Sequence, residues 1–140
     1  MRRSAFTLLE LTLVLTIAGM VLALTAPRFA LLRDRAAVQS AVSDLGGAFS
    51  AARQFAIARR SQVAIVLDTA GGTVEVHSYG ERLLRRTLRA AYGISLGANR
   101  DSAVYDARGL GYGVSNITVT VRRGAIVDTL TMSRMGRARW

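Results

Sequence analysis

The chain has 140 residues, which leaves room for one membrane helix and one small domain. It contains no cysteine, and this excludes a disulfide framework, a thiolate metal site and a thiol nucleophile. All 19 basic residues are arginines, against 9 acidic residues, and the formal charge of +10 favours anionic partners such as lipid headgroups, lipopolysaccharide or nucleic acid. The alternative is a solvated surface whose arginines reflect a GC-rich genome, and composition does not choose between the two.

An apolar segment, residues 6–26, follows a short leader, residues 1–5, that contains Arg2 and Arg3. As a helix this segment would span roughly 30 Å, the thickness of the hydrocarbon core of a bilayer. A helix that is apolar on all sides is typical of lipid or of a bundle of helices. The two arginines predict that the N-terminus stays in the cytoplasm and that the rest of the chain is exported.

Glu10 is the single charge in this segment. A carboxylate inside a membrane helix is costly unless it is paired or reaches the interface, and such residues are often functional. The structural alternative places Glu10 at headgroup depth, where it complements the positive end of the helix dipole. A secretory signal peptide would have a shorter apolar run. The best cleavage site for a signal peptidase in this segment, after Ala26, is followed by Pro27, which does not favour that alternative.

The order AFTLLE at residues 5–10 resembles the N-terminal signal of type IV pilins and pseudopilins. A plain signal anchor would leave this order unexplained. The resemblance implies that a prepilin peptidase cuts after Ala5, that Phe6 becomes N-methylated, and that Glu10 pairs with the free amine of a neighbouring subunit. Glycine is usual before the cut, so with Ala5 we expect processing that is slower or normal, not absent.

Helical periodicity returns beyond Pro27, where a lost backbone donor and a clash with the preceding turn predict a kink. We expect an amphipathic helix over residues 27–60 whose apolar stripe covers a core. Gly46 and Gly47 cost about 1 kcal/mol each relative to alanine and indicate a bend or close packing. The stripe comprises Leu31, Ala37 or Val38, Ala41 or Val42, Leu45, Phe49, Ala52, Phe55 or Ala56, and Ala58.

From Ser61 onwards the apolar period becomes two, which is typical of strands. Residues 81–91 fit a helical turn or an edge strand, and from the context we expect a strand. Glycines at 109, 111 and 113 indicate a flexible connection. The other predicted strands are residues 63–67, 73–79, 92–96, 103–106, 115–122 and 125–133, with turns at Gly71–Gly72 and Arg123–Gly124.

The predicted elements give an α+β fold, a long kinked N-terminal helix packed on a small antiparallel sheet domain, residues 61–140. This architecture is similar to that of pseudopilins, and several details resemble the GspH/FimT type of minor pseudopilin. Those details are the ARQFAIARRS stretch at 52–61, the late glycine-rich segment and the Gly-Arg-Ala-Arg ending at 136–139. The resemblance implies other pilins, a prepilin peptidase and an inner-membrane assembly platform as partners.

The sequence offers no constellation for catalysis, a cofactor or a metal. His77 is the only histidine, and a hydrolytic triad needs a nucleophile, a base and a carboxylate in one pocket. Asp101 and Asp106 are two carboxylates with arginines beside them, which does not favour calcium. The glycines of residues 109–113 lack the Lys-Ser/Thr of a phosphate loop. We therefore expect a structural protein and not an enzyme.

The C-terminal residues 133–140 carry three arginines and no acid. In FimT-like proteins a similar Gly-Arg-x-Arg ending binds DNA, which would assign phosphate contacts to Arg134, Arg137 and Arg139 and base stacking to Trp140. The alternative is a frayed or merely solvated tail. The sequence thus predicts a minor pseudopilin of a type II secretion pseudopilus or a type IV pilus tip, with a DNA-uptake pilin as the alternative.

Overall fold

The computed structural model describes residues 7–113 and 116–140, so Ala5 and Phe6 lie outside the described residues. Its chain divides into two compact units, one ending at Arg33 and the other running from Asp34 to Trp140. The elements in chain order are α1 (Leu8–Arg59), β1 (Val63–Asp68), β2 (Thr73–Ser78), β3 (Glu81–Thr87), α2 (Leu88–Tyr92), β4 (Ser95–Ala98), β5 (Ser102–Tyr105), β6 (Ile117–Arg123), β7 (Ile126–Met132) and β8 (Ala138–Arg139).

The first unit is the apolar part of α1. Every side chain described over residues 7–23 and 28–33 is exposed, although most of them are apolar. Within the described residues, α1 is the one helix long and apolar enough to cross a membrane. The helix is continuous through position 27, so Pro27 does not end it. Such a surface is stable only in lipid or against other helices.

The second part of α1 buries one face. Its buried residues recur at three- and four-residue steps, as an amphipathic helix requires. The predicted stripe is confirmed along this length but is wrong at Leu31 and Ala58, which are exposed. Ala58 follows the buried Ala56 by two positions, which places it on the opposite face of the helix. The buried set on α1 is Val38, Ala41, Val42, Leu45, Ala48, Phe49, Ala52 and Ala56.

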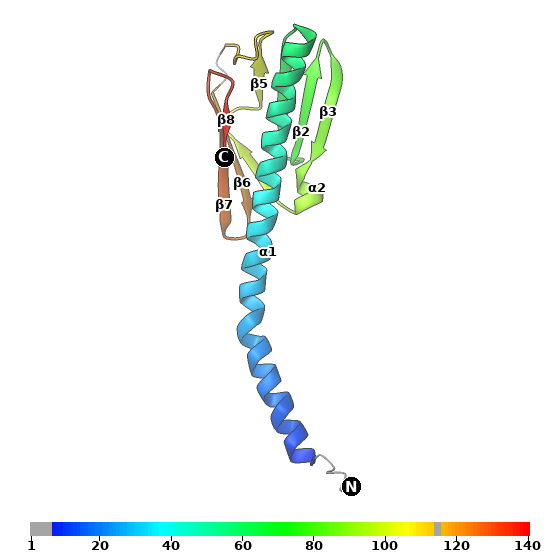
Figure 1. The fold of residues 1–140 in the computed structure, drawn as a ribbon, viewed down its shortest axis with the longest axis vertical. Coiled ribbons are helices and arrows are strands. Elements are labelled where there is room, and N and C mark those ends of the chain that lie inside the picture. Colours follow the sequence, from blue (N-terminus) through cyan, green and yellow to red (C-terminus); the bar gives the residue numbers. More distant parts are fainter. Residues whose placement is uncertain (1–6, 114–115) are drawn as a thin grey trace. The chain divides into compact units, whose positions relative to one another are not determined.

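The strands form two four-stranded sheets, in the orders β3-β2-β1-β5 and β4-β6-β7-β8. Every pairing between these strands is antiparallel, with registers such as Ile65 opposite Val76 and Val119 opposite Leu130. Inward residues of both sheets join the stripe of α1 in one apolar core. Figure 1 shows α1 passing along both sheets, with β2 and β3 on one side and β6, β7 and β8 on the other. The predicted α+β class is confirmed, and the division into two sheets is an addition to it.

The ambiguous segment from residue 81 contains both a strand and a helix. The expected strand is correct over β3, but Leu88–Tyr92 forms the short helix α2. Leu88 is fully buried, and Gly93 ends the helix in the left-handed conformation with φ 63°. The strand expected at residues 92–96 begins later, at Ser95. One buried leucine and one glycine therefore decide a segment whose local pattern fits either structure.

A partly buried ion pair joins the sheet domain to α1. Arg123 Nε donates to Asp34 Oδ1 at 2.8 Å, and the same guanidinium donates to the carbonyl of Tyr92. The two charged side chains are 23% and 26% exposed. Arg123 thus connects the β6–β7 hairpin, α2 and the first residue of the second unit.

The core predicts a contrast between two truncations. Leu45 is 0% exposed on α1, so Leu45→Ala should lower the free energy of unfolding by about 2–5 kcal/mol. Val127 is 46% exposed on β7, so Val127→Ala should cost less than about 1 kcal/mol. Denaturant unfolding of the full chain in non-ionic detergent, followed by tryptophan fluorescence, measures both. Equal losses would contradict the packing described.

Candidate functional site

The N-terminus of α1 is capped by Thr7. The amide of Glu10 donates to Thr7 Oγ1 at 3.2 Å, and the amide of Leu11 donates to the Thr7 carbonyl at 3.2 Å. Threonine at the N-cap with glutamate three residues later is the sequence of a capping box. Sequence reasoning missed this role, which the spacing Thr-x-x-Glu could have indicated. Glu10 therefore also lies where a negative charge favours the start of a helix.

The carboxylate of Glu10 has no partner within residues 7–113 and 116–140, whereas nearby hydroxyls are satisfied. Thr12 Oγ1 donates to the Leu9 carbonyl at 2.9 Å, and Thr16 Oγ1 donates to the Thr12 carbonyl at 2.7 Å. These bonds let threonine lie in an apolar helix at little cost. Over residues 7–23, Glu10 is therefore the one polar side chain that has no partner in the described part of the chain.

The C-terminal residues form a hairpin instead of a frayed tail. β8 pairs with β7 at Thr131 and Met132. In the connecting turn, the Gly136 amide donates to the Ser133 carbonyl at 2.9 Å, and the Ser133 amide donates to the Arg137 carbonyl at 2.9 Å. Gly136 has φ +69°, and a side chain there would collide with the carbonyl oxygen of Gly109. We call residues 133–140 the C-terminal hairpin.

The loop after β5 supports this hairpin. Asp106 Oδ1 accepts from the amides of Arg108 and Leu110, each at 2.9 Å, and the Gly111 amide donates to the Arg134 carbonyl at 3.1 Å. The bond from the Leu110 amide is the main reason why the pKa of Asp106 is lowered. The glycine-rich stretch, predicted to be a flexible connection, is thus fixed by hydrogen bonds over residues 106–111.

Trp140 packs on α1 at Gly46. A Cβ atom at Gly46 would lie 2.6–2.8 Å from three atoms of the six-membered ring of Trp140, so only glycine allows this contact. The close-packing interpretation is correct for Gly46, while Gly47 has open space around its Cβ position. Trp140 remains 58% exposed, which leaves part of its ring accessible.

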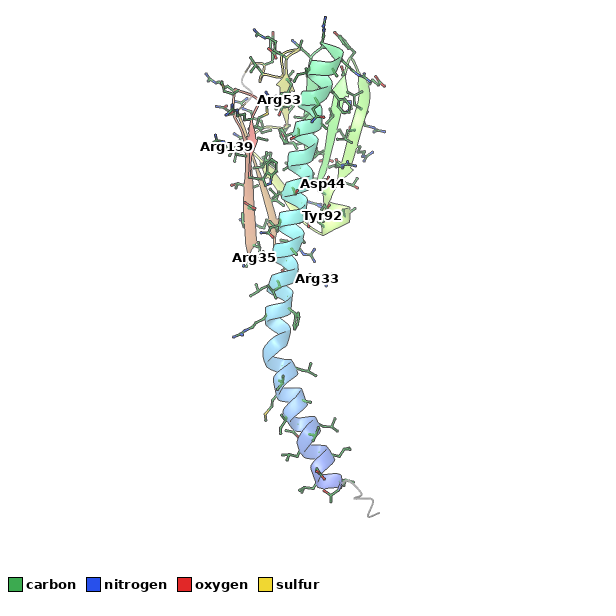
Figure 2. The ribbon with its side chains drawn as sticks, viewed as in Figure 1. Arg33, Arg35, Asp44, Arg53, Tyr92 and Arg139 are labelled. Atoms are coloured by element: carbon green, nitrogen blue, oxygen red, sulfur yellow. The ribbon has the colours of Figure 1, made fainter. Side chains whose placement is uncertain are left out.

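A groove of about 520 Å³ lies between α1 and the C-terminal hairpin, and we call it the α1–tail groove. Figure 2 shows two of its arginines, Arg53 on α1 and Arg139 on the hairpin. Arg137, Arg139 and Trp140 are brought together here, but Arg134 is not among the lining residues. The lining residues are Phe49, Ser50, Arg53, Gln54, Ile57, Tyr105 and residues 136–140.

Two residues of this groove were missed by sequence reasoning. Tyr105 is fully buried, its hydroxyl has no hydrogen-bond partner among the described residues, and burial raises its pKa to about 12. Arg53 Nε is also buried without a partner in the described chain. The positive charge of Arg53 acts on the phenol in the opposite sense to burial and is outweighed. No sequence pattern marks either residue.

The remaining polar groups that the sequence analysis considered have structural partners. His77 Nε2 lies 2.9 Å from Glu75 Oε2, and Arg82 and Arg85 approach the same carboxylate at 3.4 Å. The His77 hydrogen bond, followed by the two guanidinium charges, lowers the pKa of Glu75. No group of three or more His, Cys, Asp or Glu residues that could hold a metal occurs in the part of the chain described. His77 therefore belongs to a surface ion network.

The sequence matches no protein-family model and no curated protein. Crystal structures of the type IV minor pilin FimU of Pseudomonas aeruginosa strain PAO1, by contrast, are similar to this chain. One, in space group P21, has a TM-score of 0.65 at 18% identity and covers 77% of this chain and 90% of its own. Another, in space group P65, has a TM-score of 0.60 at 17% identity over 72% and 90%. The chain has a pilin fold.

Within this pilin fold, the two adjacent glycines of α1 provide a matched test of the Trp140 contact. Gly47→Ala should stabilise the protein by about 0.5–1 kcal/mol through helix propensity alone. Gly46→Ala gains the same propensity but displaces the Trp140 ring, so tryptophan emission should shift to longer wavelength as the ring is hydrated. Emission spectra and thermal unfolding of both variants decide this. Identical emission in the two variants would contradict the contact.

Proposed function

We propose that this protein is a minor pseudopilin or minor pilin, a structural subunit that polymerises through α1. The observation that carries this proposal is the fully exposed apolar surface of α1 over residues 7–23, on which Glu10 is the one polar side chain without a partner among the described residues. The pilin fold supports it. Before assembly the subunit lies in the inner membrane, with a cytoplasmic N-terminus and a periplasmic domain, and a prepilin peptidase cuts between Ala5 and Phe6.

Glu10 gives this assembly its register. In a low-dielectric bundle an isolated carboxylate is costly, and a nearby cation restores favourable Coulomb energy only at the correct distance. The methylated amine of Phe6 on a neighbouring subunit would be such a cation. A subunit that is added out of register would leave both charges unpaired. The pairing therefore favours one axial position of each subunit in the filament. The partners in this proposal are other pilins and the inner-membrane assembly platform.

Replacement of Glu10 tests this role. Glu10→Ala and Glu10→Gln should leave the protein in the membrane fraction but abolish its incorporation into sheared filaments, because the intersubunit pair is lost. Immunoblots of both fractions, from cells that lack the wild-type copy, measure this. Thr12→Ala is the matched control, since it removes only a bond within the helix. Normal incorporation of both Glu10 variants would refute the proposed pairing.

A second candidate function is DNA uptake, with the C-terminal hairpin as a receptor. Arg134, Arg137 and Arg139 are exposed and form no ion pair with the described residues, so their charges are available to phosphates. Trp140 is available for base stacking only through the part of its ring that does not face Gly46. The genes beside this one would separate the candidates, since secretion ATPase and secretin genes favour the first and competence genes the second.

DNA binding is measured by fluorescence anisotropy of a labelled oligonucleotide with the full chain in non-ionic micelles. Three phosphate contacts predict a slope of about −2 to −3 in a plot of log affinity against log salt. Arg137→Ala combined with Arg139→Ala should flatten this slope. The control is Arg100→Ala with Arg122→Ala, which removes the same charge from exposed positions elsewhere. Binding that is absent, or equally affected by both pairs, would count against the receptor function.

A further inference from the structure

Two residues that line the α1–tail groove, Arg53 and Tyr105, each have a buried hydrogen-bonding group without a partner in the described chain. Tyr105 is 0% exposed and its hydroxyl has no partner among the described residues, and the same holds for the buried Nε of Arg53. Buried polar groups in proteins are nearly always hydrogen-bonded, because an unsatisfied one forfeits its interaction with water. Two such groups in one groove indicate a ligand that supplies what they lack.

Both groups call for an acceptor. A guanidinium has donors only, and the Tyr105 phenol, with a pKa of about 12, stays protonated at neutral pH. Arg137 and Arg139 add two positive charges, and no aspartate or glutamate lines the groove. None of the three arginines has an ion-pair partner in the part of the chain described. The complementary group is therefore an anion.

The walls of the groove restrict what can carry this anion. Phe49, Ile57, Ala138 and Trp140 are apolar, so they favour a carrier that is apolar beside its charge. Because Tyr105 is fully buried, a ligand can reach it only with an acceptor group at the tip of a narrow chain. A carboxylate at the end of an acidic side chain meets this requirement. A phosphodiester is substituted on both sides and runs along a surface instead.

We propose that the α1–tail groove binds an acidic peptide segment of a partner protein, with one carboxylate directed at Arg53 and Tyr105 and a neighbouring apolar side chain against Trp140. Arg137 and Arg139 then attract the segment electrostatically, while the two buried donors fix its position. The inference rests on the proposed assembly role only for the origin of the segment, which would be a neighbouring subunit.

Trp140 is the only tryptophan of the protein, so its fluorescence reports on the groove. The test uses the full chain in non-ionic micelles and the probe acetyl-Gly-Leu-Glu-Leu-Gly-amide, with the Gln analogue as its matched control. The Glu peptide should change Trp140 emission in a saturable manner and bind at least about tenfold more tightly than the Gln peptide, as expected for a charge-assisted contact. Equal responses to the two peptides, or none, would overturn the proposal.

Variants then locate the binding site. Arg53→Gln and Tyr105→Phe should each weaken binding of the Glu peptide by about tenfold, and Arg35→Gln, an exposed arginine earlier on α1, should not. Thermal unfolding of unliganded Tyr105→Phe should be no lower than that of the wild type, because the substitution removes only an unpartnered hydroxyl. Unchanged binding by both groove variants would overturn the proposal.

Oligothymidylate provides the competing outcome. We expect that oligothymidylate does not displace the Glu peptide at physiological salt. Oligothymidylate binding that requires Arg53 and Tyr105, in the absence of peptide binding, would make the groove a nucleic-acid site and overturn the peptide proposal. None of these measurements depends on filament incorporation, so their failure is distinct from a failure of the Glu10 test.

Discussion

Both sheets of this protein depend on one apolar stripe of α1, from Val38 to Ala56. Strands β1 and β2 of the first sheet pack one set of inward residues against the stripe, and strands β6 and β7 of the second sheet pack another. All of these residues belong to a single core. Alanine at four of the eight buried positions keeps the helix surface narrow, so that strands from two sheets can share it. Without the stripe, each four-stranded sheet would expose its apolar face to water.

The same arrangement creates the α1–tail groove. Since α1 is shared, the C-terminal hairpin at the end of the second sheet lies beside the helix, and Trp140 reaches Gly46. The loop after β5, which belongs to the first sheet, meets this hairpin through Gly109 and Gly111. Elements of both sheets and the helix therefore surround Tyr105 and Arg53. The groove is a consequence of packing, and its charge comes from arginines that this packing leaves without acids.

Periodicity in the sequence predicts α1, the two hairpins that turn at Gly71–Gly72 and Arg123–Gly124, and most of the inward-facing residues, because each of these depends on neighbours within a few residues. Periodicity does not predict the two sheets or the contact of Trp140 with Gly46, since these depend on residues far apart in the chain. The segment ERLLRRTLRAA fits both periods, so the burial of Leu88 decided it. The resemblance of residues 136–139 to the Gly-Arg-x-Arg ending of FimT-like proteins marks Arg137, Arg139 and Trp140 as candidates. In the sequence, by contrast, Arg53 resembles any surface arginine and Tyr105 any core aromatic. The cleavage site at Ala5 and Phe6 stays a prediction.

The docking of Trp140 on a glycine also limits how the protein can be labelled. An affinity tag or fluorescent protein joined after Trp140 would begin at a residue that lines the groove and whose ring lies against Gly46. A tag before Phe6 would be removed with the leader if processing occurs as proposed. The turn between β2 and β3 is a better position, because Tyr79 there is 90% exposed and Gly80 has no heavy atom near its Cβ position. A small epitope inserted between these two residues would lie away from the groove, which neither of them lines.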